Sequence, residues 1–334
     1  MTTIEVAELW RFPVKSMGGH RIDEVRVDGR GVRADRLWAL RDLENGVTAS
    51  ARRMPALLGC SARYEAEPAD DAGPGNVPSV VVTFPDGDEC SSSDAEVHRR
   101  LSELVGRDVR LTALPPVDDT SQHRLAARQA KANFSVTQLR SDFGLSDSDA
   151  MPDTSVFTPK QLMTLARFST PPGTFVDLSP VHLLTTTSLR SLSADGAGYD
   201  VRRFRPNVLL DVLFDVGDPE SAFPEADWVG GTVVIGSAEL QVTIPTIRCV
   251  VPTRPQPGVE LDRQVSRQLA ERTDRFLGIY ADVSTPGRLR VGDRVHVRKP
   301  AEPSAVHRTA TAAARRASRG VQRLLEATVL RGKA

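Results

Sequence analysis

The sequence is poor in cysteine and in lysine. It has three cysteines in 334 residues, and five lysines against 38 arginines. Three widely spaced cysteines do not make a disulfide framework. The sequence contains neither a CxxC pair nor an HExxH motif. We therefore expect no structural zinc site and no iron–sulfur cluster held by this chain alone.

Several other features are missing, and each absence excludes a class of protein. No apolar run reaches about 18 residues, so no transmembrane helix is expected. The first 16 residues, MTTIEVAELWRFPVKS, lack the pattern of a signal peptide, which predicts a cytoplasmic protein. The formal net charge of +0 predicts no general attraction to nucleic acid. No glycine-rich phosphate loop of the P-loop or dinucleotide type is present.

The pattern of short strands predicts a mostly β protein with short helices, an α+β chain built from two barrel-like β domains. The strands begin within residues 4–42, a hairpin is expected at 231–245 and a final hairpin at 281–297. Helices are expected at 94–106 and 261–278. We divide the chain into a first β domain at 1–116, a variable insertion or linker at 117–175, a second β domain at 176–300 and a basic C-terminal helix or tail at 301–334.

Cys249 lies in TIPTIRCVVPTRPQPG, between an apolar run and a series of prolines. A thiolate is both a nucleophile and a soft metal ligand, and a neighbouring arginine such as Arg248 favours that form. The alternative is a small buried hydrophobe, which is how free cysteine commonly behaves. The position at the end of a strand, beside arginine and before a rigid loop, favours a functional thiol.

Other candidate residues lie in short polar motifs. In FPVKSMGG, Lys15 and Ser16 could hold a phosphate through a charge and a hydrogen bond, or could form a surface turn. Arg36 and Arg52 could bind an anion or could be surface charges at strand edges.

A second group lies in DLSPVHLLTTTSL and FRPNVLL, which present Asp177, Ser179, Arg205 and Asn207. An arginine and an asparagine separated only by a proline can grip an anion or the edge of a heterocycle. Together with one thiolate, these cations and hydrogen-bonding groups suit a phosphorylated, nitrogen-rich cofactor that carries a soft metal.

The order of these motifs resembles that of MOSC proteins with an N-terminal β-barrel domain, a family that includes the mitochondrial amidoxime-reducing component and bacterial single-chain members. The matching pieces cover most of residues 4–297. In chain order they are LWRFPVKS, GVRADRLWALRD, ARRMPAL, DLSPVHLLTTTSL, FRPNVLL, RCVVPTRPQPG and LGIYADVSTPGRLRVGDRVHV.

The resemblance implies a molybdenum cofactor of the molybdopterin type, with Cys249 as the metal ligand and catalytic thiol. It implies an oxidoreductase that reduces N-hydroxylated or N-oxygenated small molecules. Asp177 is a candidate proton relay. The residues expected to bind the cofactor are Lys15, Ser16, Arg36, Arg52, Ser179, Arg205, Asn207 and Arg248.

The chain also departs from the family. Leu178-Ser179 stands where mitochondrial relatives have Thr-Ser, and the loop after Cys249 differs, which leaves substrate choice open. Three cysteines exclude a fused plant-type ferredoxin domain, so electrons would come from a separate ferredoxin- or flavin-type reductase. Two alternatives remain: a sulfur-carrying or C–S bond-processing protein that uses Cys249, and a carrier that stores the cofactor without turnover.

Overall fold

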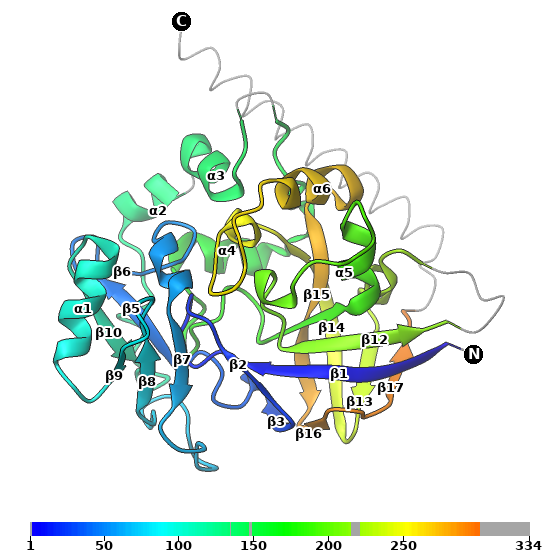
Figure 1. The fold of residues 1–334 in the computed structure, drawn as a ribbon, viewed down its shortest axis with the longest axis horizontal. Helices are drawn as coiled ribbons and strands as arrows, with labels where there is room; N and C mark the ends of the chain where they lie inside the picture. The colour runs from blue at the N-terminus through cyan, green and yellow to red at the C-terminus, as the bar shows by residue number, and fades with distance from the viewer. Residues whose placement is uncertain (1, 134, 147–148, 215–220, 301–334) are drawn as a thin grey trace, which may run out of the picture.

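The computed structural model describes residues 2–133, 135–146, 149–214 and 221–300. Most of the regular structure is strand, with short helices around it (Figure 1). This confirms the expected fold class. Within the described ranges, no helix is long and apolar enough to cross a membrane. The basic segment expected to form a helix or tail, 301–334, lies outside the described residues.

The largest sheet has eight strands in the order β17-β13-β14-β15-β11-β12-β1-β2. Its pairs are antiparallel except β11 with β12. Along β14, buried and half-buried residues alternate through all ten positions, the period expected of a strand with one face on a core. The strands are β1 (Thr3–Arg11), β2 (His20–Ile22), β11 (Val181–Thr185), β12 (Val208–Leu213), β13 (Thr232–Ile235), β14 (Ala238–Ile247), β15 (Phe276–Thr285) and β17 (Val295–Arg298).

This sheet curls until its two ends approach each other. Val6 N–H donates to the carbonyl of Asp293 at 3.0 Å, and Gly292 N–H donates to the carbonyl of Val6 at 2.8 Å. Only an isolated bridge, Glu5 with Arg294, joins β1 to the chain just before β17. Among the described residues the sheet is therefore barrel-like without being closed by a continuous hydrogen-bond ladder.

Three small sheets complete the β structure, in the orders β10-β5-β6, β16-β3-β4 and β7-β8-β9. The second of them joins strands from the two ends of the chain, because β16 pairs with β3. The strands are β3 (Glu24–Asp28), β4 (Gly31–Val32), β5 (Trp38–Asp42), β6 (Val47–Thr48), β7 (Ser61–Tyr64), β8 (Val80–Thr83), β9 (Glu89–Ser91), β10 (Val109–Ala113) and β16 (Gly287–Arg290).

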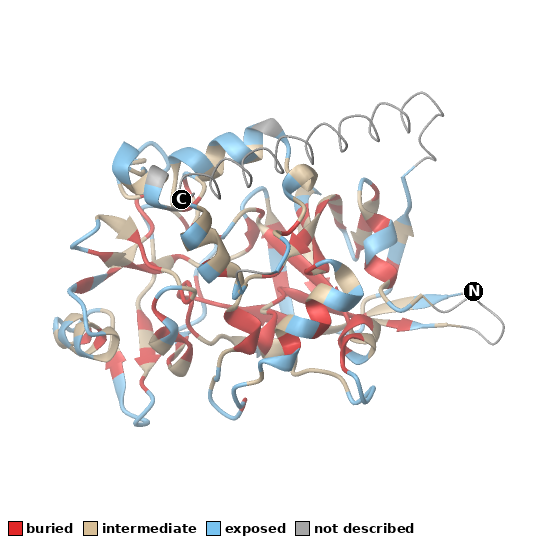
Figure 2. Cartoon of the chain, turned by 90° about the horizontal axis from the view of Figure 1, so that it is seen from above, coloured by how far each residue is buried: buried red, intermediate tan, exposed pale blue. Residues whose placement is uncertain are grey.

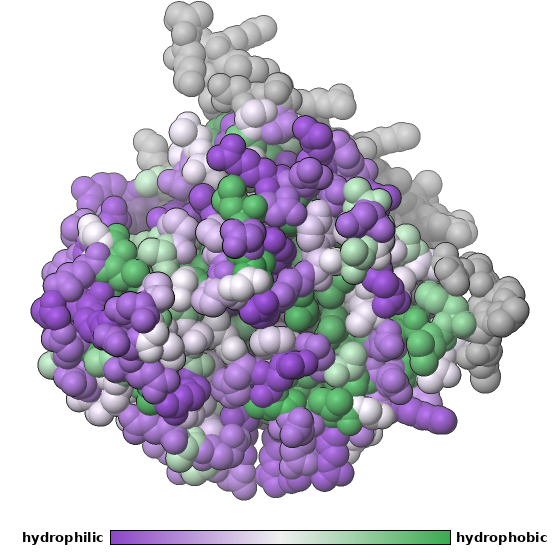
Figure 3. Space-filling model, viewed as in Figure 1, coloured by the Kyte–Doolittle hydropathy of each residue, from purple (hydrophilic) through white to green (hydrophobic). Residues whose placement is uncertain are grey.

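The helices lie around the sheets, and Figure 2 shows burial concentrated on the strands while helices carry exposed faces. Polar side chains dominate the face drawn in Figure 3, with apolar side chains confined to patches. The α-helices are α1 (Glu96–Val105), α2 (Ala127–Asn133), α3 (Val136–Phe143), α4 (Pro159–Arg167), α5 (Thr186–Leu192) and α6 (Gln264–Thr273). The 3₁₀ helices are η1 (Pro55–Gly59), η2 (Thr154–Val156), η3 (Val201–Arg203), η4 (Pro224–Trp228) and η5 (Val251–Thr253).

Two of the sequence predictions for the C-terminal part were wrong in detail. The helix expected at 261–278 runs only over α6, because Asp274 and Arg275 adopt positive φ and β15 starts directly afterwards. The final hairpin expected at 281–297 does not form: β16 pairs with β3, and β17 pairs with β13. The turn between β16 and β17 bonds instead to Val6 of β1, which separates the two strands.

The apolar interior divides into two main cores. One contains Val14, Met17, Leu57 and Leu101 together with other residues up to Phe175, and the other joins β1 to the strands after residue 180. Leu9 belongs to the second core, so the chain passes from one core to the other within 10–14. The segment just after this crossing carries Lys15 and Ser16. The division of the chain at 116, 175 and 300 stays a prediction.

Gly278 lies where β15 packs closely against β11, and it has φ of +79°. A Cβ there would lie 2.5 Å from His182 Nε2 and 2.8 Å from the carbonyl oxygen of Leu183. We predict that Gly278→Ala lowers the melting temperature clearly more than Gly292→Ala does. Gly292 has a similar φ of +85° but no atom within 4 Å of an added Cβ.

Gly292→Ala should therefore cost only the left-handed backbone, about 1–2 kcal/mol. Gly278→Ala should have the same backbone cost and should in addition displace a carbonyl of β11. Thermal unfolding of both variants measures the difference, and equal melting temperatures would contradict the close approach of β15 to β11.

Candidate functional site

The structure brings the ten residues predicted for the site to one cavity between the two cores. The cavity has about 770 Å³ of space free of protein atoms, part of it open to solvent. Its predicted lining residues are Lys15, Ser16, Arg36, Arg52, Asp177, Ser179, Arg205, Asn207, Arg248 and Cys249. They come from loops and strand ends more than 230 residues apart in the chain, so only the folded protein forms this site.

Three of these residues have a left-handed backbone. Ser16, Arg36 and Arg205 have φ of 71°, 52° and 56°, which residues other than glycine rarely adopt. Hydrogen bonds hold one of them: Arg36 N–H donates to the Phe12 carbonyl at 2.7 Å, and Phe12 N–H donates to the Asp35 carboxylate at 2.7 Å. Backbone strain of this kind persists only where surrounding contacts fix it, and it gathers at functional sites.

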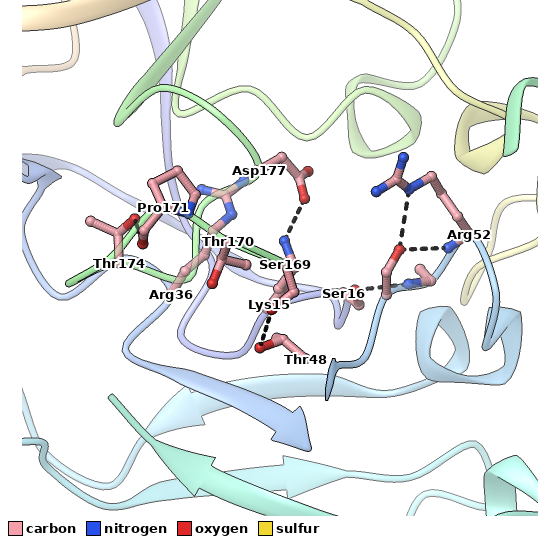
Figure 4. A network of polar contacts seen from close by, with 12 residues as sticks. Lys15, Ser16, Arg36, Thr48, Arg52, Ser169, Thr170, Pro171, Thr174 and Asp177 are labelled. Atoms are coloured by element: carbon pink, nitrogen blue, oxygen red, sulfur yellow. Dashed lines mark hydrogen bonds and ion pairs between the residues drawn. The ribbon is translucent and has the colours of Figure 1, made fainter. Parts of the chain in front are cut away.

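A buried lysine pairs with a carboxylate at the cavity. Lys15 is only 5% exposed, and its ammonium donates to Asp177, whose side chain faces the open space and is 68% exposed (Figure 4). Burial lowers the pKa of Lys15, although Asp177 partly offsets this effect. The pKa of Asp177 falls well below its usual range: the carboxylate loses part of its hydration at the cavity although its side chain is exposed, and the charges of Lys15 and Arg52 outweigh that loss. Asp177 is therefore ionised at neutral pH.

Arg205 has a guanidinium group without hydrogen-bond partners. Within the described structure, its Nη1 and Nη2 atoms are buried and unpaired. The group lies over the Phe12 ring at 4.4 Å, and Arg36 lies over the same ring at 4.9 Å. Burial and the neighbouring Arg36 lower the pKa of Arg205 to about 9. Unpaired donors next to a second cation are what an absent anion would satisfy.

Arg248 is fixed more firmly than Arg205. Its Nη2 donates to the carbonyl of Phe204 at 2.7 Å, and its Nη1 lies 3.4 Å from His182 Nε2. The guanidinium also lies over the Phe204 ring at 5.3 Å. Arg248 thus contributes charge to the cavity while its donors hold the protein together.

Cys249 lies two residues after the end of β14 and is half-buried, with Ala51, Leu58 and Val251 as its apolar neighbours. The next residue, Val250, donates its N–H to the carbonyl of Asp142 at 3.0 Å, so the end of α3 supports the thiol loop.

The other two cysteines behave differently. Cys60 and Cys90 are buried, and burial raises the pKa of Cys60 to about 12 and also raises that of Cys90. Among the three cysteines, Cys249 alone lines the cavity.

Three further predicted residues have structural partners within the protein. The Asn207 side chain accepts a hydrogen bond from His182 N–H at 3.2 Å and donates to the Trp10 carbonyl at 3.4 Å, which joins β11 to β1. Ser16 Oγ accepts from Ala51 N–H at 2.9 Å, and Arg52 lies 3.6 Å from the Asp142 carboxylate. Ser179 is buried at the cavity wall.

Sequence reasoning missed part of the cavity. The missed lining residues are Ser50, Ala51, Val176, His182, Phe204, Ile247, Val251 and Tyr280. Two of these had a signal, since His182 is the one polar ring in an apolar strand and Tyr280 lies in a motif that carries the resemblance. The apolar members had none, because nothing in the sequence separates a cavity wall from a core.

The charge of the lining determines what the cavity can hold. Lys15, Arg36, Arg52, Arg205 and Arg248 face one lining carboxylate, so the cavity favours an anion. Within the described part of the chain, no group of three or more His, Cys, Asp or Glu residues could hold a metal ion. A metal here would need ligands beyond the protein, with Cys249 as the available thiol.

Comparisons with known proteins identify the family of this chain. Residues 3–121 match the MOSC N-terminal beta barrel domain, and residues 171–296 match the MOSC domain. Mitochondrial amidoxime reducing component 2 from Homo sapiens is 27% identical and the Bos taurus protein 25%, each over 87% of this chain and 82% of its own length. The YUAD protein from Bacillus subtilis covers 90% of this chain and 98% of its own, at 11% identity and a TM-score of 0.40. The chain therefore belongs to the MOSC family, with a MOSC N-terminal β-barrel domain followed by a MOSC domain.

Proposed function

We propose that this protein binds a molybdenum cofactor in the cavity and reduces N-hydroxylated or N-oxygenated small molecules. The family match and the amidoxime-reducing relatives support a function related to the molybdenum cofactor. The observation that carries the proposal is the unpaired guanidinium of Arg205 in the same cavity as a half-buried thiol. The cavity lining thus combines donors that suit an anion with a thiol that suits a soft metal.

The lining residues fit a phosphorylated pterin. Lys15, Arg36 and Arg205 would hold its phosphate or heterocycle, and the hydroxyls of Ser16 and Ser179 would add hydrogen bonds. The remaining arginines, Arg52 and Arg248, would add positive charge near the thiol. Cys249 would supply the thiolate that completes the sulfur coordination of the metal. Asn207 would act mainly by fixing the strands around Arg205, since its amide already bonds to both.

For an N-hydroxylated substrate the reaction needs two electrons and two protons: the N–O bond breaks, one proton goes to the nitrogen, and the other joins the hydroxyl group, which leaves as water. When bound, the cofactor would supply the redox chemistry, and the protein would orient and tune it. The depressed pKa of Asp177 makes this carboxylate a poor proton donor, so we assign it to holding the Lys15 ammonium. Of this pair, the Lys15 ammonium, whose pKa is lowered, would release a proton, whereas the ionised Asp177 has none to give.

Electrons would come from a separate protein. The three cysteines are fewer than the four that a plant-type cluster needs. A ferredoxin- or flavin-type reductase is therefore proposed as the partner.

The Cys249→Ser variant tests the metal ligand. In a host that makes the cofactor, we expect wild-type protein to retain close to one molybdenum per chain. We expect the molybdenum content of Cys249→Ser to be at least about tenfold lower, because even changes outside the direct ligands lower metal affinity by that factor. Cys90→Ser is the matched control. Cys90 is buried away from the cavity, so this variant should keep its molybdenum. Elemental analysis measures all three.

Wild-type protein without molybdenum would overturn the proposal. Reduction of benzamidoxime by the dithionite-reduced wild type would separate a reductase from a cofactor carrier. Sulfide release that depends on Cys249 would point to sulfur transfer instead.

The Arg205→Gln variant tests the anion site, and it should change binding and stability in opposite directions. Cofactor retention should fall, whereas the melting temperature of the cofactor-free protein should stay the same or rise, because the variant removes a buried charge without a partner. Arg203→Gln is the control. Arg203 is also buried, but it donates to the carbonyls of Pro252 at 3.0 Å and Glu260 at 2.8 Å.

Arg203→Gln should therefore lower the melting temperature of the cofactor-free protein by several degrees, about 2–4 °C per kcal/mol lost. Differential scanning calorimetry of both variants makes the comparison. A fall of the same size in Arg205→Gln would mean that Arg205 serves the fold and is not kept for a ligand.

A further inference from the structure

His182 has no role in the function proposed above, although it lies at the wall of the cavity. It comes from β11, a strand whose residues are all buried, and it is itself only 5% exposed. Its ring packs against Tyr280 with the centroids 5.5 Å apart. Gly278 leaves room for the ring, since an added Cβ would come within 2.5 Å of Nε2. The imidazole of His182 therefore packs closely against β15.

The two ring nitrogens of His182 face different kinds of partner. Nε2 lies 3.4 Å from Arg248 Nη1, and Nδ1 lies 3.5 Å from the carbonyl oxygen of Arg205. A guanidinium only donates and a carbonyl only accepts. These partners fit a ring that carries its proton on Nδ1 and accepts at Nε2, and the backbone of Leu277 is a further hydrogen-bond partner of the ring. Burial, and after it the charge of Arg248, lower the pKa of His182 well below its usual value, which agrees with a neutral ring.

These contacts join the two parts of the site. Arg205 is the left-handed residue whose guanidinium is unpaired, and Arg248 directly precedes Cys249. Arg248 has a second anchor at the Phe204 carbonyl, 2.7 Å from Nη2. Phe204 therefore holds the Arg248 guanidinium from the segment that carries Arg205, and His182 of β11 contacts both Arg248 and the Arg205 carbonyl. The position of the thiol relative to the anion-binding arginine is set through this cluster.

We propose that His182 is a positioning residue that fixes the Cys249 loop relative to Arg205 before any cofactor binds. The benefit of such a residue rests on the proposed function, because a ligand with an anionic group and a soft metal needs both partners at one separation. The contacts themselves belong to the protein alone. Removing the imidazole leaves a buried Arg248 donor without its acceptor and loosens the loop.

The test measures the alkylation rate of Cys249 in the full-length, cofactor-free protein, with iodoacetamide as the probe and peptide mapping to separate the three cysteines. A leucine at 182 removes both polar contacts. Because an unsatisfied buried donor favours local opening, we expect His182→Leu to speed alkylation about tenfold. His182→Gln keeps a donor and an acceptor, so its rate should stay within about twofold of wild type.

His123→Leu is the matched control. His123 is also a buried histidine, which bonds Thr170 Oγ1 at 2.8 Å and packs against Phe175 in the other core. This variant should lower stability while leaving the Cys249 rate unchanged. Equal acceleration in His123→Leu and His182→Leu would overturn the proposal, because general loosening would then explain both.

An unchanged Cys249 rate in folded His182→Leu would also overturn it. If His182→Leu does not fold, His182→Asn replaces it: the shorter amide reaches only one partner, and a wild-type rate in that variant contradicts the proposal equally. None of these rates depends on molybdenum. A wild-type protein that never binds molybdenum would therefore refute the proposed function while leaving the positioning role standing.

Discussion

The pairing of β1 with β12 determines where the cavity forms. Thr3 lies opposite Leu213 and Leu9 opposite Val208, so the first strand is part of the C-terminal sheet. The chain then enters the other core within a few residues, and Val14 and Met17 are fully buried there. Lys15 and Ser16 are held at the junction by this crossing, opposite the segment that ends β14. Without it, the cations before residue 60 would lie apart from Arg205, Arg248 and the Cys249 thiol.

The charged groups that line the cavity at this junction lower the stability of the ligand-free protein. Arg205 is buried beside Arg36 with its terminal donors unpaired, and Lys15 is buried with a single carboxylate to balance it. Three lining residues also keep a left-handed backbone. A sequence selected for stability alone would replace such groups, so their presence is best explained by a ligand that offsets the cost when it binds. Arg203 differs from Arg205 in this respect, because its guanidinium donates to two backbone carbonyls.

Local sequence patterns predict part of the fold. The mostly β class, the hairpin of β13 and β14 and the helix α1 follow from such patterns. The partners of β1, β3, β16 and β17 do not, because pairing between strands at opposite ends of the chain leaves no local signal. Lys15, Arg205 and Cys249 were singled out because they stand in unusual local settings; the structure places them at one cavity, and their roles stay predictions. His182 was missed because a histidine in an apolar strand reads as part of a core until its partners are known.

The central claim is that Cys249 provides a sulfur ligand to a molybdenum held by the cationic cavity. X-ray absorption at the molybdenum edge of purified protein tests it most directly, because the scattering counts sulfur atoms around the metal. The account predicts one more sulfur neighbour in the wild-type protein than in whatever molybdenum-loaded fraction of Cys249→Ser can be isolated. The same number of sulfur neighbours in both proteins would contradict it.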